Sequence, residues 1–490
     1  MSENSWPEND SCNELEPIGI IAALPTSEES DDTTPDPFRG YRGRRRKAAA
    51  VLVVIWSGTI ALHLVTWGYW LILGLTTLMG LHAVRFLFAR PSDLPEPLSE
   101  QTQDYPFVSL MVSAKNEEAV VGNLAKMLCG LDYPSDRYEV WVIDDNSSDQ
   151  TPVLLDRLAE EYSQLHVFHR PAGAGGGKSG ALNQVFPMTQ GEIVVVFDAD
   201  AQVEPDFLRR VVPAFDRQQV GAVQVRKAIV QAEPDSQSKD ANNFWVRGQM
   251  AEMALDAFIH QQRIAIGGIG ELRGNGQFVR RKALEVCGGW NEETITDDLD
   301  LTIRLHLNQW DIDVITVPAV YEEGVTNAIA LWHQRNRWAE GGYQRYLDYW
   351  QLLVRNRMGT RKSIDLVMFW VLQYVMPTAA IPDFLMAIVR NRPLLLSPVS
   401  ALTLVLFLCS TFGGLRRIQR LRDSTDQRRL TLKGIDFSFM VALLQSLRGT
   451  LYMMHWLPIV SSTTARMSIR PKRLKWVKTV HRGMDGGEGL

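Results

Sequence analysis

The sequence is poor in cysteine, and its first residues lack positive charge. The four cysteines, Cys12, Cys129, Cys287 and Cys409, show no paired spacing that would indicate a zinc site or a disulfide framework. A reduced, cytosolic setting for the soluble part is therefore expected. Residues 1–37 contain Asp and Glu but no Lys or Arg. With their Pro, Ser and Asn content, they predict a disordered acidic tail over residues 1–38.

Lys and Arg gather instead beside apolar runs. Hydrophobic residues make up 46% of the 490-residue chain, but the long apolar runs are confined to residues 48–88 and 364–460. Basic clusters flank these runs at Arg39–Lys47, Arg416–Arg420 and Arg466–Lys478. The positive-inside rule accounts for all three clusters, so no nucleic-acid partner is expected. The sequence predicts a multi-pass integral membrane protein whose polar centre faces the cytoplasm.

Residues 48–88 predict a transmembrane hairpin. The run is long enough for two helices of about 20 residues each, and Trp67-Gly68-Tyr69-Trp70 at its midpoint is typical of an interfacial turn. Basic residues at both ends place both ends of the hairpin in the cytoplasm.

The second apolar region predicts two further spans, within residues 364–415. Amphipathic helices that lie in the membrane interface are expected before them, at residues 331–360. The run 436–460 is interrupted by Arg448, His455 and Pro458, and we expect a re-entrant, interfacial or transmembrane segment, or a kinked pair around Gly449. A basic cytoplasmic tail follows at residues 465–490.

The centre of the chain, residues 105–330, alternates between two patterns. Strand-like runs rich in Val and Ile lie at Phe107–Ala114, Tyr138–Ile143, Leu165–His169 and Glu192–Phe197, and helical patterns at Glu117–Leu131, Thr151–Tyr162 and Gly180–Pro187. This alternation predicts an α/β domain with a mostly parallel sheet covered on both faces. Ligands bind beyond the carboxyl ends of such strands, so the polar residues there are the first candidates for a site.

Two pairs of carboxylates end strands of the predicted sheet. Asp198-Ala199-Asp200 directly follows the run that ends at Phe197, and two carboxylates at this spacing suit Mg²⁺ or Mn²⁺. Asp-x-Asp is also a common loop element. Asp144-Asp145 ends an earlier strand and is expected near a nucleotide base or the metal. A simple helix cap by Ser148 or Asp149 is compatible with that interpretation.

Three further segments carry candidate residues. Gly173–Gly177 and Lys178 do not match a P-loop in context, and a flexible loop that presents Lys178 to a diphosphate is the better interpretation. Thr296-Asp297-Asp298 precedes a helical pattern. Thr296 there is either a helix cap or the neighbour of a general base. Gln334, Arg337 and Trp338 fall on one face of a helix, which alone indicates only a basic interfacial face.

Taken in order, these motifs resemble membrane-bound family 2 glycosyltransferases, which include the cellulose and hyaluronan synthases. The resemblance covers about residues 105–350, from Ala114-Lys115-Asn116-Glu117 to Gln334–Trp338. It implies a GT-A fold, a UDP-sugar donor, a divalent cation (Mg²⁺ or Mn²⁺) and inversion at the anomeric carbon. The segment Arg337–Gly342 and the small membrane part look most like the monoglucosyldiacylglycerol synthases of photosynthetic bacteria. That similarity implies glucose transfer from UDP-glucose to a lipid acceptor in the membrane, 1,2-diacylglycerol, with a β-linked product.

The resemblance also implies a role for each motif residue. Asp298 is expected to be the catalytic base, and Asp198 and Asp200 to hold the metal. Asp297 stands where the family usually has Glu. The expected nucleotide-sugar-binding residues are Asn116, Glu117, Asp144, Asp145, Lys178, Asp198, Gln334, Arg337 and Trp338. Trp476–His481 is similar to the gating segment of several relatives and adds Lys478 and Thr479 as candidates.

Other functions stay open at this point. A processive polysaccharide synthase would share these motifs but needs a translocation channel, for which four clear spans are few. A catalytically inactive binding protein is disfavoured by the acids at 198, 200 and 298. A transporter would leave the large strand–helix centre without a role.

Overall fold

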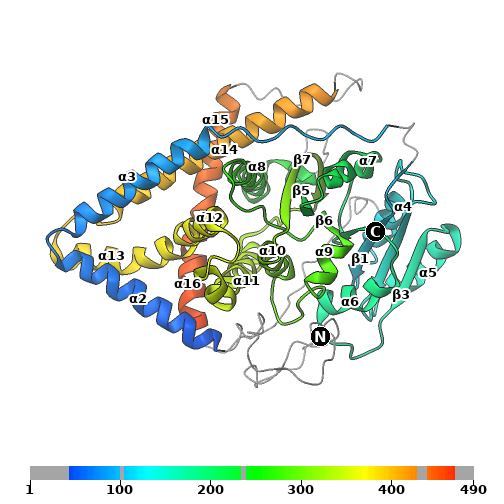
Figure 1. Cartoon of the computed structure of the whole chain (residues 1–490), viewed down its shortest axis with the longest axis horizontal. Helices are drawn as coiled ribbons and strands as arrows, with labels where there is room; N and C mark the ends of the chain where they lie inside the picture. Colours follow the sequence, from blue (N-terminus) through cyan, green and yellow to red (C-terminus); the bar gives the residue numbers. More distant parts are fainter. Residues whose placement is uncertain (1–42, 100–103, 233–238, 427–438, 470–490) are drawn as a thin grey trace.

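The computed structural model describes residues 43–99, 104–232, 239–426 and 439–469. A sheet covered by helices forms one part of the molecule, and long helices from both ends of the chain form the other (Figure 1). The predicted tail at 1–38 and the segment with Lys478 and Thr479 lie outside the described residues.

The sheet has seven strands in the order β3-β2-β1-β4-β6-β5-β7, and only β6 runs antiparallel to its neighbours. The strands are β1 (Val108–Ala114), β2 (Tyr138–Asp144), β3 (Leu165–His169), β4 (Ile193–Phe197), β5 (Val220–Ile229), β6 (Gln277–Arg280) and β7 (Asp311–Glu322). The prediction of a mostly parallel sheet is confirmed, and its four strand-like runs correspond to β1–β4.

Side chains alternate between the two faces of the sheet and build two cores. In β4, Ile193, Val195 and Phe197 pack on one side, while Val194 and Val196 pack on the other. The first core is covered by α4 (Val121–Cys129), α5 (Thr151–Glu161) and α7 (Phe207–Val211), and the second by α6 (Gly177–Val185), α9 (Arg281–Val286) and α10 (Asp297–Leu307). Both faces are buried, which is why these strands read as continuous apolar runs.

Two helix starts differ from the predicted ones. Helix α4 begins at Val121 rather than Glu117, because the backbone N–H of Glu117 donates to the Thr151 hydroxyl (2.9 Å) in a preceding turn. Asn116 in that turn has a positive φ of 54°. Helix α6 begins at Gly177 rather than Gly180 and so takes Lys178 into its first turn.

Among the described residues, four helices are long and apolar enough to cross a membrane. They are α2 (Arg44–Leu64), α3 (Gly68–Leu87), the continuous helix Thr360–Arg390 and the segment Ser397–Leu421 of α14 (Ser397–Asp426). The helix Thr360–Arg390 consists of α12 (Thr360–Trp370), a π-helical turn (Val371–Val375) and α13 (Met376–Arg390). In Figure 1, α3 runs beside α14 and α2 beside α13, and each pair also packs together.

The remaining helices join these two parts. They are α8 (Phe244–Ala265), α11 (Ala328–Val354), α15 (Phe439–Met453) and α16 (Trp456–Ile469). Helix α11 covers most of the predicted interfacial region 331–360. It buries Tyr343 and Tyr346 against α10, α12 and α16, while Trp332 and Trp350 are exposed.

The run 436–460 is broken at Met454 and His455, and not around Gly449 as one of the alternatives had it. Gly449 instead lets α15 approach α8, because a Cβ at this position would lie 2.6 Å from the Cβ of Ala251. Neither α15 nor α16 has the length of a candidate span.

Candidate active site

A single cavity of about 2340 Å³ lies beyond the carboxyl ends of the strands and extends between the long helices. It collects nearly all predicted site residues that the structure describes. They are Asn116, Glu117, Asp145, Lys178, Asp198, Asp200, Asp297, Asp298, Gln334, Arg337 and Trp338. Asp144 does not line the cavity.

Asp198 and Lys178 form an ion pair at the end of β4. The Lys178 Nζ lies 2.5 Å from Oδ1 of Asp198. Burial alone would raise the pKa of Asp198, but the charge and hydrogen bond of Lys178, together with the charges of Lys227 and Arg337, outweigh it and lower this pKa. Asp198 is therefore ionised. Its carboxylate, at the end of β4, and the ammonium group of Lys178, on α6, both line the cavity.

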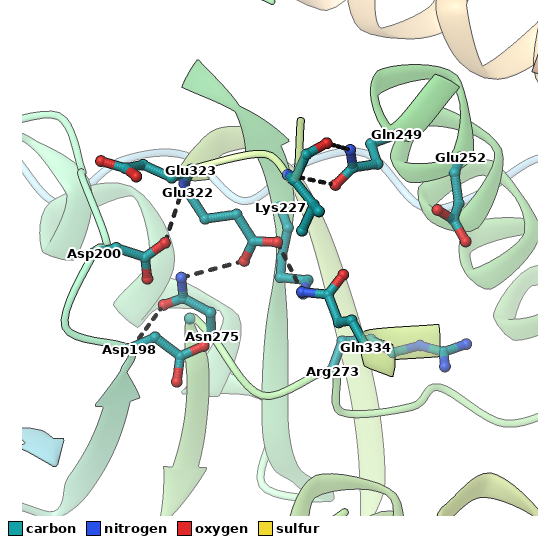
Figure 2. A network of polar contacts seen from close by, with 12 residues as sticks. Asp198, Asp200, Lys227, Gln249, Glu252, Arg273, Asn275, Glu322, Glu323 and Gln334 are labelled. Atoms are coloured by element: carbon teal, nitrogen blue, oxygen red, sulfur yellow. Dashed lines mark hydrogen bonds and ion pairs between the residues drawn. The ribbon is translucent and has the colours of Figure 1, made fainter. Parts of the chain in front are cut away.

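Asp200 belongs to a network that links β4, β6 and β7 (Figure 2). Its Oδ2 accepts a hydrogen bond from the backbone N–H of Glu323 (3.1 Å). Asn275 accepts from the backbone N–H of Asp198 (3.2 Å), and Glu322 lies 3.3 Å from the Lys227 Nζ. The network holds the Asp-x-Asp turn against the ends of β5 and β7.

The residues present fit a divalent cation that is shared with a diphosphate. Within the described residues, no group of three or more His, Cys, Asp or Glu is arranged to hold a metal by itself. Mg²⁺ commonly takes only one or two carboxylates from the protein and the rest of its ligands from phosphates and water. Asp198 and Asp200 are two such carboxylates, both on the cavity wall.

The turns after β1 and β2 lie together on one side of the cavity. Asn116 Oδ1 accepts from the backbone N–H of Ser148 (2.7 Å), and Asp145 pairs with Arg170 and Lys115. Asp144 is 3% exposed and uses its two oxygens for the Ser147 N–H and the His169 ring. Asp144 therefore holds the turn after β2 in place without reaching the cavity. Asn116, Glu117 and Asp145 line the cavity at these two turns.

Asp297 and Asp298 begin α10. Thr296 makes no capping hydrogen bond with its side chain, and its hydroxyl is buried without a partner among the described residues. The capping alternative for Thr296 is therefore not what the structure shows. Burial, and next the charge of Asp297, raise the pKa of the Asp298 carboxyl to about 6. Such a carboxylate can accept a proton near neutral pH.

Gln334, Arg337 and Trp338 line the cavity from α11. The Trp338 ring lies close to two cations, with Arg335 Cζ at 3.9 Å and Lys227 Nζ at 5.0 Å from its centroid. Arg335 is 1% exposed and donates to Glu252 of α8 (2.5 Å), which also accepts from Tyr452 of α15 (3.0 Å) and Trp456 of α16 (2.9 Å). This side of the site is thus tied to α8, α15 and α16.

Several residues of the site were not anticipated from the sequence. Lys227, Arg273 and Glu322 line the cavity, and Asn275 and Glu322 take part in the network around Asp198. Lys227 and Glu322 lie at the ends of β5 and β7. Polar residues at strand ends, the signal used for Asp198, would have found both had those strands been recognised.

Comparison with known proteins assigns the family. Residues 106–341 match the family described as glycosyltransferase like family 2. Two beta-monoglucosyldiacylglycerol synthases are similar over the whole chain. That of Trichormus variabilis is 60% identical over 487 residues (99% of each chain), and that of Synechocystis is 53% identical over 486 residues (98% of this chain and 97% of its own). The chain belongs to the beta-monoglucosyldiacylglycerol synthase family.

Membership in this family confirms the predicted glycosyltransferase class and, with the mostly parallel sheet, the GT-A fold. As a beta-monoglucosyldiacylglycerol synthase family member, the protein is a hexosyltransferase with membrane helices on both sides of its catalytic domain. Among solved structures, the mannosyltransferase PcManGT from Pyrobaculum calidifontis, in complex with GDP-Man and Mn²⁺, is similar with a TM-score of 0.46 and 18% identity, covering 84% of this chain and 99% of its own.

Proposed function

We propose that the protein transfers glucose from UDP-glucose to 1,2-diacylglycerol and releases β-monoglucosyldiacylglycerol and UDP. One observation supports this most directly: a single cavity contains both the nucleotide-side motifs and apolar side chains of the long helices. A water-soluble donor and a membrane lipid can meet in such a space. The names of relatives that are 53% to 60% identical over nearly the whole chain support the same sugar and acceptor.

The donor occupies the side of the cavity formed by the turns after β1, β2 and β4. Asn116, Glu117 and Asp145 contact the nucleoside, and Lys178 lies at the diphosphate together with the amino end of α6. Asp144 acts by holding the Asp145 turn in place. A bound Mg²⁺ or Mn²⁺, held by Asp198 and Asp200, would offset charge on the UDP leaving group.

Transfer takes place between Asp298 and the face of α11. Asp298 accepts the proton of the lipid hydroxyl while the hydroxyl oxygen bonds to the anomeric carbon and the bond to UDP breaks. Attack from the face opposite UDP inverts the anomeric centre and gives the β product. Gln334, Arg337 and Trp338 border the acceptor and the donor diphosphate. Burial, and next the charge of Asp297, keep the pKa of Asp298 high.

The membrane arrangement we propose has four spans and a cytoplasmic catalytic domain. An even number of crossings returns the chain to the catalytic side before α15. Arg44, at the start of α2, is bound to Asp348 of α11 (2.7 Å), so the basic end of this helix lies beside the catalytic domain.

A donor-by-acceptor panel tests the proposed function. The purified protein in mixed micelles is given radiolabelled UDP-glucose, UDP-galactose or UDP-N-acetylglucosamine, with diacylglycerol, ceramide or no added lipid. We expect a single labelled glucolipid from UDP-glucose and diacylglycerol, identified by chromatography and mass spectrometry. The Asp298→Asn variant is the matched negative control. A labelled polymer would instead identify a processive polysaccharide synthase, and a different glycolipid would correct the donor or the acceptor.

A further inference from the structure

Part of the cavity lies among the long helices and not at the sheet. Its walls there come from α3, the helix Thr360–Arg390, α14, α15 and α16, with contributions from Ala83, Phe369, Ala380, Leu404 and Leu457. We call this part the helix chamber. It is continuous with the space that contains Asp298, and the whole cavity greatly exceeds the roughly 300–1,000 Å³ typical of a small-molecule pocket.

The helix chamber is lined by an unusual share of methionine. Met79, Met368, Met376, Met453 and Met454 all contribute to its walls. Methionine is unbranched and has three rotatable bonds, so a surface rich in it adapts to apolar groups of varying shape. Such a lining suits flexible acyl chains of different lengths better than one rigid ring system.

Charge in the helix chamber favours an uncharged ligand. Among the described lining residues on these five helices, Arg466 is the single Lys or Arg, and it pairs with Glu340 (2.8 Å). Asp365 is bound to Arg263, and Asp383 accepts from His63 and from the backbone N–H groups of Leu395 and Leu396. A phosphate would meet Arg466 and Arg263 only as cations that already pair with carboxylates, so little would compensate its loss of hydration. A neutral lipid meets no such cost.

One polar group in the helix chamber has no partner. Gln373 lines the cavity within the π-helical turn Val371–Val375, and its Oε1 is buried without a hydrogen bond among the described residues. Buried amides normally find partners, so each exception needs an explanation. The flanking lining residues Leu372 and Met376 are apolar. The next residue, Tyr374, donates to the backbone carbonyl of Ala339 on α11 (3.0 Å), one residue after Trp338, so this turn packs directly on the helix that borders the site.

We propose that the helix chamber is the binding site of the acceptor lipid, a neutral lipid with two acyl chains. The chains lie between α3, α13 and α14, and the free hydroxyl points to Asp298. A half-turn of the Gln373 amide puts its NH₂ group where the unpartnered Oε1 lies, and this group donates to an ester carbonyl of the lipid. This assignment rests on the proposed function for the identity of the reaction, and it adds where the acceptor sits and what selects it.

Neighbouring residues on α13 and α14 provide matched pairs for a test. Ala380 and Leu404 line the chamber, whereas Ile381 and Val405 are exposed and do not line it. We expect Ala380→Trp and Leu404→Trp to raise the acceptor KM at least tenfold for long-chain diacylglycerol, and less for dioctanoylglycerol, because Trp occupies space that the chain ends need. Ile381→Trp and Val405→Trp should leave the acceptor KM for each of the two lipids within twofold of wild type.

Gln373→Leu tests the polar contact. We expect it to raise the acceptor KM for both chain lengths by a similar factor, with the Kd for UDP unchanged by titration calorimetry and the melting temperature close to wild type. A purely structural role would instead lower the melting temperature and affect donor and acceptor alike. Unchanged acceptor KM in a folded Gln373→Leu protein would overturn the role of Gln373.

Photocrosslinking separates this inference from the proposed function. A diacylglycerol with a diazirine near the end of one acyl chain is bound to the wild-type protein without donor, irradiated and mapped by mass spectrometry. Crosslinks at chamber residues of α13 and α14 support the site even if no glucolipid forms, and in that case only the proposed function fails. Crosslinks confined to outer residues such as Ile381 would contradict the assignment of the helix chamber as the acceptor site. Equal kinetics for the lining and control Trp variants would contradict it as well.

Discussion

Two adjacent carboxylates at the start of α10 give the site its proposed base. Asp297 and Asp298 are both half-buried at the cavity, and like charges so close cannot both ionise easily. The pKa of Asp297 is raised as well, and one of its oxygens is buried without a partner among the described residues. The pair explains how a carboxylate can serve as a base for a lipid hydroxyl near neutral pH.

Transfer should depend on pH through this pair. The pKa of Asp298 is raised to about 6, so the residue is protonated and inactive below that pH and becomes an effective base above it. We expect kcat to rise with pH across a midpoint near 6. Asp297→Asn removes the neighbouring charge and should move the midpoint to lower pH. An acid limb that stays in place in Asp297→Asn would show that another group titrates.

The base itself is tested by Asp298→Asn. We expect kcat to fall by roughly 10²–10⁴, the usual contribution of general-base catalysis. UDP should still bind, because Asp298 acts on the acceptor hydroxyl. Calorimetry with UDP beside the activity assay measures both quantities. If a folded variant no longer binds UDP, Asp298 belongs to the donor site.

Asp200 should matter through the cation. We expect activity to require Mg²⁺ or Mn²⁺ and Asp200→Ala to weaken UDP binding in the presence of the metal but not in its absence. Asp200→Ala removes neither partner of the Lys178–Asp198 ion pair. UDP binding measured without metal is therefore the control for damage to the rest of the donor site. Full activity after prolonged dialysis against EDTA, with metal content checked, would contradict the cation assignment.

At the scale of elements, two glycines of α11 bring the catalytic and membrane parts together. A Cβ on Gly341 would lie 2.2 Å from the Thr296 hydroxyl, and one on Gly342 would lie 2.4 Å from the Tyr374 hydroxyl. Helix α11 therefore touches the residue before the Asp297–Asp298 pair on one side and the π-helical turn of the membrane helix on the other. Larger residues would separate these elements.

Gly341→Ala should consequently damage both packing and activity. Overpacking of this kind costs about 1–3 kcal/mol, and a shift of Thr296 would move Asp298 away from its acceptor. Gly80→Ala on α3 is the control, because a Cβ there meets nothing within 4 Å. Melting temperature and kcat should fall in Gly341→Ala and stay near wild type in Gly80→Ala. Wild-type values for Gly341→Ala would show that α11 can move without consequence.

The sequence predicted those elements whose signal is local. Strands β1 to β4 are apolar runs that end in polar residues, and this pattern exposed Asp145, Asp198 and Asp200. Strand β6 has only four residues and pairs antiparallel with β4 and β5, so its place depends on partners far along the chain. Asn275 precedes β6 and Glu322 ends β7, so their contact depends on where both strands lie in the sheet and could not be read from local sequence.

The inner contacts of the long helices escaped prediction for a similar reason. The pattern around Trp332 and Trp350 predicts an amphipathic helix, but not that its middle is buried by α10 and α16. Arg335 lies within the Gln334–Trp338 segment, and its partner Glu252 is 83 residues away on α8. An ion pair of this kind depends on the tertiary arrangement of two helices, which no periodicity encodes.

At the scale of the whole molecule, one cavity has a polar side that suits a water-soluble donor and an apolar side that suits a membrane lipid. The polar side is built by strand ends and turns, and the apolar side by helices from both ends of the chain, with α11 between them (Figure 1). Membrane segments on both sides of the catalytic domain are needed for this, since α3 comes before the sheet and α13 and α14 come after it. A soluble catalytic domain alone would lack the helix chamber.

The last prediction concerns the path of the chain through the membrane: both termini face the cytoplasm. Arg44–Lys47 begin α2 and Arg416–Arg420 lie near the end of α14. At the opposite ends of the spans, Arg390 and Arg392 lie beside the turn between α13 and α14. Helix α16 packs on α11, and its Arg466 binds Glu340, so the chain is still on the catalytic side at that point. A single crossing by 436–460 would place the basic tail outside, against the positive-inside tendency.

Cysteine labelling tests this path. In a variant without native cysteines, Asp485→Cys should react with a membrane-impermeant maleimide only after permeabilisation. Tyr69→Cys, in the exposed first turn of α3 beyond the hairpin turn, is the matched control and should react in intact cells. Labelling of both sites in intact cells would place the carboxyl terminus outside, because the reagent then reaches Asp485→Cys without crossing the bilayer. Such a result would require an odd number of crossings after the catalytic domain, with α15 and α16 together forming the additional one.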